Sequence, residues 1–144
     1  MKDAICHSDA PSWKTLGMRK QYNFWEGDAW DVDRLVELSA RLPVTDVALA
    51  SIPEVDSTYW FNGSDELPTV RNIVDHVRLI QAVDLSYPII MSASDRVMDG
   101  MHRIARAILE GLATVKAVRF ITDPEPDYIN CRLADLPYDQ IDSA

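Results

Sequence analysis

The sequence contains few cysteines and no long hydrophobic segment. Its two cysteines, Cys6 and Cys131, lie near opposite ends of the 144-residue chain and lack the spacing of a metal site. No apolar run approaches the length of a membrane span, and the first residues include no apolar segment typical of a secretion signal. We therefore expect a cytoplasmic protein with no membrane partner.

Several catalytic motifs are also missing. The chain has only five glycines, and they form no Walker-type glycine-rich loop. There is no G-x-S-x-G motif of an acyl hydrolase, no internal repeat and no low-complexity tract. The three histidines, His7, His76 and His102, have no metal-ligand spacing with one another or with the cysteines. The sequence therefore identifies no metal ligands.

Basic residues are outnumbered, with 14 Lys and Arg against 23 Asp and Glu, which gives a net charge of −9. Residues 123–144 contain six acids and one arginine, which gives −5, whereas residues 96–119 contain five basic residues and two acids, which gives +3. Binding to duplex DNA by counterion release is not expected from such a balance. A small anion held in the one locally basic stretch fits the charge better.

The clearest periodic signal begins directly after Asp99-Gly100. Apolar residues recur there at the spacing of one face of an α-helix. Gly111 provides a stop signal near the end of this predicted helix. The apolar face consists of Met101, Ile104, Ala105, Ile108, Leu109 and Leu112.

The other face of this helix begins with His102, Arg103 and Arg106. Cations in the first helical turn are disfavoured by roughly 0.3–1 kcal/mol, because they lie at the positive end of the helix dipole. A phosphate or carboxylate, held by backbone amides and a guanidinium group, would offset them. Gly100 would let the backbone approach such a ligand closely.

A structural alternative explains the same residues without a ligand. Asp99 would cap the helix, Gly100 would form the turn, and the arginines would be solvated. Arg106 would then pair with Glu110, four residues further on. The spacing alone does not distinguish these two interpretations.

The pattern strand, Asp99-Gly100-x-His102-Arg103, helix resembles the ParB/sulfiredoxin superfamily and matches the D-G-H-H-R variant of its small-molecule kinase branch. Tyr87-Pro88-Ile89-Ile90 is similar to the P-I-x-V strand of ParB N-terminal domains, and the likeness covers Val44 to Thr122. The resemblance implies an α+β fold with a small mixed sheet and flanking helices. It also implies that the corner and the helix start bind nucleotide phosphates, through Gly100, Met101, His102, Arg103 and Arg106.

The chain departs from this family at two positions. Met101 occupies the place of the sulfiredoxin catalytic cysteine, so sulfiredoxin activity is not expected. Met101-His102 also replaces Glu-Arg of the ParB G-E-R-R motif, which counts against centromere binding.

In the free-serine kinase branch, a glutamate in the region after the first core strand looks like the catalytic base. Glu54 matches it here, with Asp56 as the competitor and an exposed acidic turn as the structural alternative. The resemblance thus implies Glu54, Asp99 and His102 as catalytic candidates.

We expect one domain in three parts. Residues 1–43 form an aromatic N-terminal extension and a first helix capped by Asp31, residues 44–122 the ParB/sulfiredoxin-like core, and residues 123–144 an acidic tail. A second helix should follow Thr69 and bury a stripe of Val70, Ile73, Val74, Val77 and Ile80. The remaining strands are expected at 44–49, 89–91, 96–98 and 114–122.

Three classes of function follow. The first is a protein that binds a nucleoside di- or triphosphate with Mg²⁺ at the corner, and transfers phosphoryl groups to a small hydroxyl compound or water. In it, Asp99 or Glu54 would hold the metal or act as the base. The second is a non-catalytic ParB-like module for a protein partner or nucleic acid, with the aromatic N-terminal segment and the acidic tail as its surface. A nuclease is a third class, which the acidic balance disfavours.

Overall fold

The computed structural model describes residues 21–61, 67–132 and 136. Its centre is a four-stranded sheet in the order β3-β6-β4-β5. The strands are β3 (Thr45–Ala48), β4 (Ile89–Met91), β5 (Val97–Asp99) and β6 (Thr114–Arg119). β4 and β6 are parallel, whereas β3–β6 and β4–β5 are antiparallel. The expected α+β class and small mixed sheet are therefore confirmed.

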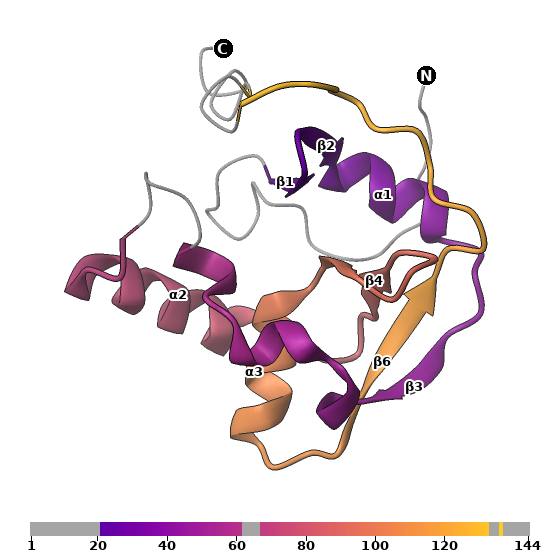
Figure 1. The fold of residues 1–144 in the computed structure, drawn as a ribbon. Coiled ribbons are helices and arrows are strands. Elements are labelled where there is room, and N and C mark those ends of the chain that lie inside the picture. Colours follow the sequence, from indigo (N-terminus) through magenta and orange to yellow (C-terminus); the bar gives the residue numbers. More distant parts are fainter. Residues whose placement is uncertain (1–20, 62–66, 133–135, 137–144) are drawn as a thin grey trace.

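The two faces of the sheet are covered by different elements (Figure 1). Ile89 and Met91 of β4 point into a core shared with α3 (Met101–Leu109). Ile90 lies between them in sequence and points to the opposite face, where it packs with Trp30 and Leu35. This alternation is the pleat of a strand that is buried on both faces.

Helices α1 and α2 begin at the capping residues that the sequence indicates, and α3 ends before the predicted glycine. Asp31 caps α1 (Val32–Ser39) by accepting from the Asp33 amide, and Thr69 caps α2 (Val70–Ala82) by accepting from the Asn72 amide. α3 ends before Gly111, whose φ of 74° places it in the left-handed region. The Leu112 amide then donates to the Ala107 carbonyl. Local capping chemistry therefore sets these helix ends.

A β-hairpin, which the sequence analysis did not predict, precedes α1. Its strands β1 (Tyr22–Trp25) and β2 (Asp28–Asp31) are joined by Glu26 and Gly27, both with positive φ, as a tight two-residue turn requires. The tail crosses this hairpin, because Tyr128 forms a bridge with Ala29. The hairpin and α1 thus cover one face of the sheet. The rest of the expected extension, residues 1–20, and most of the tail beyond 132 lie outside the described residues.

The predicted burial of the α2 stripe is wrong, and part of the apolar face of α3 is exposed as well. Of the α2 stripe only Ile80 is buried, whereas Val70 is 81% exposed. On α3, Met101 and Ile104 are buried, but the C-terminal part of the stripe is exposed. These exposed residues are Ile108, Leu109 and Leu112. The periodicity located the apolar faces correctly. It did not reveal that the described residues leave much of these faces exposed.

None of the helices in the described part of the chain is long and apolar enough to cross a membrane.

Candidate functional site

The predicted corner lies where β5 passes into α3. Gly100 is the N-cap of α3 and has a φ of 111°. A Cβ on Gly100 would lie 2.6 Å from Cγ2 of Ile89, a buried residue of β4. Glycine is therefore required here by close packing and by positive φ, independently of any ligand.

The N-terminus of α3 has no side-chain cap. The structural alternative is wrong in making Asp99 the cap, because Gly100 takes the N-cap position and has no side chain. The Ile104 amide donates to the Gly100 carbonyl, which starts the helical hydrogen bonds. The amides of Met101, His102 and Arg103 precede that bond, and such first-turn amides have no acceptor within a helix. The Met101 side chain is buried in the core, so only its backbone can face a ligand.

Asp99 and Arg103 form an ion pair across the corner. The Arg103 Nη2 atom donates to Asp99 Oδ2 at 2.9 Å, and both side chains are mostly buried. Burial raises the pKa of the Asp99 carboxyl above its usual value, while the Arg103 charge opposes this rise. Asp99 therefore supplies one negative charge that offsets Arg103. The Arg103 Nε atom is also buried, and it has no hydrogen-bond partner within the described residues.

Arg106 does not lie where the sequence analysis placed it. It belongs to the last turn of α3, not the first. Its Nη1 atom donates to the Gln81 carbonyl at 2.9 Å, and its Nε atom lies 2.5 Å from Glu110 Oε2. Arg106 thus joins α3 to the end of α2 and makes the pair with Glu110 that the structural alternative anticipated. We leave it out of the proposed site.

His102 pairs with His76 of α2. The His102 Nε2 and His76 Nδ1 atoms are 2.8 Å apart, so the two rings share one proton. The rings are nearly coplanar, and both stack on Trp60, at centroid distances of 4.6 and 4.3 Å. Burial, then the neighbouring His76 and Arg103, lower the pKa of His102 to about 4. His102 is therefore neutral at pH 7, and it does not provide the positive charge expected from the sequence.

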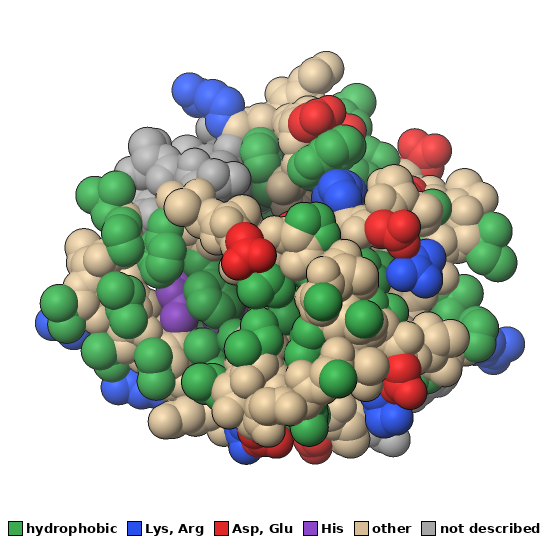
Figure 2. Space-filling view, turned by 60° about the horizontal axis from the view of Figure 1, so that its bottom comes forward, with side chains coloured by type: hydrophobic (Ala, Val, Ile, Leu, Met, Phe, Trp, Pro, Cys, Tyr) green, Lys and Arg blue, Asp and Glu red, His purple; other side chains and the backbone are tan. Residues whose placement is uncertain are grey.

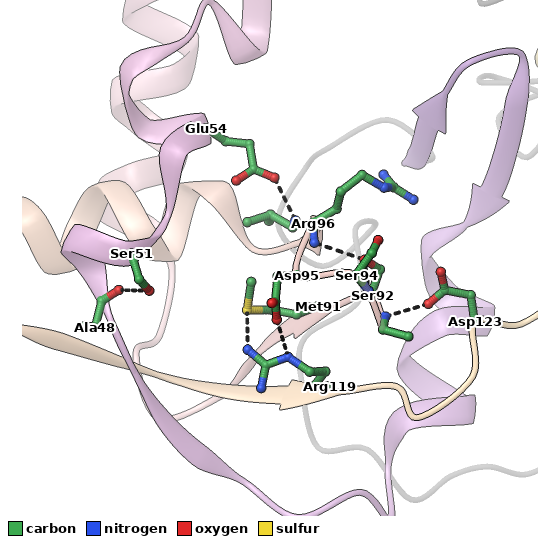
Figure 3. A network of polar contacts seen from close by, with 12 residues as sticks. Ala48, Ser51, Glu54, Met91, Ser92, Ser94, Asp95, Arg96, Arg119 and Asp123 are labelled. Atoms are coloured by element: carbon green, nitrogen blue, oxygen red, sulfur yellow. Dashed lines mark hydrogen bonds and ion pairs between the residues drawn. The ribbon is translucent and has the colours of Figure 1, made fainter.

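Glu54 reaches the start of β5 from the 3₁₀ helix η2 (Pro53–Asp56), as Figure 3 shows. Its Oε2 atom accepts from the Val97 amide at 2.9 Å, while Oε1 is buried without a partner in the described chain. The competitor Asp56 is exposed. Of the two acids, the structure therefore places Glu54 against the sheet edge.

Tyr59 connects Glu54 with the corner. It belongs to the 3₁₀ helix η3 (Tyr59–Phe61), and its hydroxyl lies 3.4 Å from the Val97 carbonyl. Burial first, and then the charges of Asp99 and Glu54, raise the pKa of Tyr59 to about 12. The charges of both carboxylate candidates, Asp99 and Glu54, therefore influence the pKa of one phenol, that of Tyr59. No periodicity or motif in the sequence indicated a role for Tyr59.

The raised pKa of Tyr59 predicts an alkaline transition. The folded state holds the phenolic proton up to about pH 12, while the unfolded state releases it near pH 10. Stability should therefore be lost as the pH rises from 10 through 12. A spectrophotometric titration of the wild type should show one phenol that ionises near pH 12. This ionisation should be absent from Tyr59→Phe. A wild-type titration in which every phenol ionises near 10 would contradict this placement.

Arg96 occupies the opposite side of β5 from Glu54, and its side chain extends to the β1–β2 hairpin (Figure 3). Its guanidinium carbon lies 4.2 Å from the ring centroid of Trp25, a cation–π distance. Its Nη1 atom lies 3.4 Å from Asn23 Oδ1. Arg96 therefore fixes the hairpin to the sheet edge, a role that its local sequence did not indicate.

The described residues contain no group of three or more His, Cys, Asp or Glu side chains that could hold a metal ion. A metal at the corner would therefore need ligands from a bound phosphate and water, beside one or two carboxylates.

No family model matches this chain. No curated protein and no solved structure matches it either. A function for this chain must therefore be inferred from the geometry of the corner.

Proposed function

We propose that the corner from Asp99 to Arg103 binds the phosphates of a nucleoside di- or triphosphate, in a ParB/sulfiredoxin-like domain. The observation that carries the proposal is a set of donors without acceptors. α3 begins without a side-chain cap, and the buried Nε atom of Arg103 in its first turn has no partner in the described chain. A phosphate oxygen is an acceptor for both kinds of donor.

The charges at the corner define how such a ligand would be held. Asp99 neutralises much of the charge of Arg103, and His102 is neutral at pH 7. Binding would therefore depend on the backbone amides of Met101, His102 and Arg103 and on the Arg103 guanidinium group. Mg²⁺ would supply the remaining positive charge, held by phosphate oxygens, water and the Asp99 or Glu54 carboxylate. The Trp60 ring would provide a wall for the base.

Phosphoryl transfer is the stronger form of this proposal. It requires a base for the acceptor hydroxyl, and Glu54, Asp99 and His102 are the candidates. Glu54 has one carboxylate oxygen without a partner in the described chain, and the raised pKa of Asp99 makes its carboxylate a better base. The acceptor would be a small hydroxyl compound or water.

Thermal unfolding with ATP, ADP, CTP or GTP and Mg²⁺ tests the phosphate site. At about 100 times its Kd, a ligand stabilises the folded state by roughly 2.7 kcal/mol. We expect one nucleotide to stabilise the wild type. It should also stabilise the control variant Arg78→Gln, which changes an exposed arginine of α2. The stabilisation should be lost in Arg103→Gln, which removes the guanidinium group from the first turn of α3.

Two outcomes would refute the phosphate site. One is the absence of stabilisation by any of the four nucleotides. The other is a stabilisation that Arg103→Gln retains, because the ligand would then bind elsewhere. If a nucleotide binds as expected, release of phosphate or of nucleoside diphosphate, measured with and without Glu54→Gln, separates an enzyme from a binding module.

A non-catalytic interaction module remains the second candidate. The observation in its favour is the exposed apolar stripe of α2, because large apolar patches on proteins mark interaction sites. The hairpin aromatic residues Trp25 and Trp30 support a protein-binding N-terminal segment less strongly. Trp30 is buried and donates to the Pro124 carbonyl within the same chain.

A further inference from the structure

Helix α2 carries an apolar stripe that no described element covers. Its residues recur at i, i+3, i+4 and i+7, and Leu67, two residues before the Thr69 cap, extends it. Figure 2 shows hydrophobic side chains spread over the left part of this view, where α2 lies in Figure 1. The stripe and its exposed fractions are Leu67 59%, Val70 81%, Ile73 46%, Val74 46% and Val77 43%.

α2 is joined to the domain through the C-terminal half of the helix. His76 pairs with His102, and the Gln81 carbonyl accepts from Arg106. Ile80, the last residue of the apolar stripe, is buried at this contact. The stripe residues before it, from Val70 to Val77, keep 43–81% of their surface exposed although α2 is anchored through these groups. The stripe can bind another molecule without rearrangement of the fold.

We propose that the stripe is the interface of a homodimer, in which α2 of one copy packs against α2 of another. The exposed fractions of the five residues correspond to an area on the order of 450 Å². A stable interface buries about 800 Å² per partner, of which about 57–65% is apolar. The apolar area of the stripe therefore matches the apolar share of one standard interface.

The arrangement of the stripe suits a two-fold axis. Ile73 and Val74 lie at its centre, with Val70 on one side and Val77 on the other. In an antiparallel pair, Val70 of one helix would lie near Val77 of the second, and the central residues would meet across the axis. Such an interface is self-complementary and closes after two copies.

The charge around the stripe permits this approach. Each chain has a net charge of −9, which opposes association of most of its surface. The helix pair α2 and α3, counted with Asp99 and Glu110, carries four arginines and three acids, a charge of +1. Within the described residues, the surface around the stripe therefore does not share the large negative charge of the chain. This inference concerns the α2 surface and does not depend on nucleotide binding at the corner.

Sedimentation velocity of the full chain tests the proposal. We expect a dimer at micromolar concentration, and a self-association at least 100-fold weaker in Val74→Glu, because two carboxylates would be buried near the axis. Ile121→Glu is the matched control, since Ile121 is 89% exposed and lies beyond β6. That variant should remain dimeric.

Ile73→Gln is a second, milder variant in case Val74→Glu fails to fold, which far-UV circular dichroism would show. It should also weaken the dimer. A wild type that is monomeric at 100 µM would overturn the proposal. A dimer that both stripe variants leave intact, or an open series of larger oligomers, would overturn it as well.

Discussion

Replacing Gly100 by alanine is expected to lower the free energy of unfolding by about 4 kcal/mol. Two effects add in this variant. The φ of 111° is strained for any residue with a Cβ, and the new Cβ would lie 2.6 Å from Cγ2 and 2.8 Å from Cβ of Ile89. Ile89 is fully buried in a strand paired on both sides, so it cannot move away. Chemical denaturation of both proteins measures the difference.

Gly111→Ala is the matched control for this prediction. Gly111 also has a positive φ, of 74°, but its Cβ would meet no atom within 4 Å. We therefore expect a loss of only about 1 kcal/mol, from the left-handed backbone alone. Equal losses in the two variants would show that the contact of Gly100 with Ile89 has no energetic weight.

Acidification from pH 7 to pH 4 is expected to remove about 3 kcal/mol of stability through His102. The unfolded state binds a proton at His102 near pH 6.5, while the folded state binds it only at about 4. Because the folded pKa is lowered, the contribution of this group is complete above pH 6.5 and falls as the pH drops through 4. The cause is burial of the ring, together with His76 and Arg103 beside it.

The comparison with His102→Gln isolates this effect. Glutamine can still bond to His76, but it does not titrate. Asp99 acts in the opposite direction, because its raised pKa favours the folded state as the pH falls. It is present in both proteins, so its contribution largely cancels in the difference. Unfolding free energies measured at pH 7, 5.5 and 4 should therefore diverge, with the wild type losing more. Parallel pH profiles would rule out a buried neutral His102.

The corner residues affected in both variants have contacts within the fold, so their presence alone does not indicate a ligand site. The structure explains Gly100 by packing, Arg103 by its pair with Asp99, and His102 by its pair with His76. None of these contacts provides an acceptor for the first amides of α3. A bound phosphate should therefore stabilise the corner. Because His102 is neutral at pH 7, its titration should affect phosphate binding only weakly around that pH.

The sequence by itself determined the local structure of this protein. Asp31, Thr69 and Gly111 set helix ends through hydrogen bonds or a backbone conformation that involve only neighbouring residues. The apolar run Ile89–Met91 predicted a strand, and the pattern at 101–112 predicted a helix after the Gly100 corner. The α+β class with a mixed sheet also agrees with the resemblance noted at that corner.

Only the tertiary structure decided what these elements contact. A helical period locates an apolar face, but it does not show whether another segment is long enough and close enough to cover it, as Val70 and Val74 demonstrate. The pair His76–His102 joins residues 26 positions apart, and Tyr59 meets Val97 across 38. Such contacts depend on how the helices and the sheet pack, so no local pattern could reveal them. The charge state of the candidate site was decided in the same way, because burial and neighbouring side chains set the protonation of His102 and Asp99.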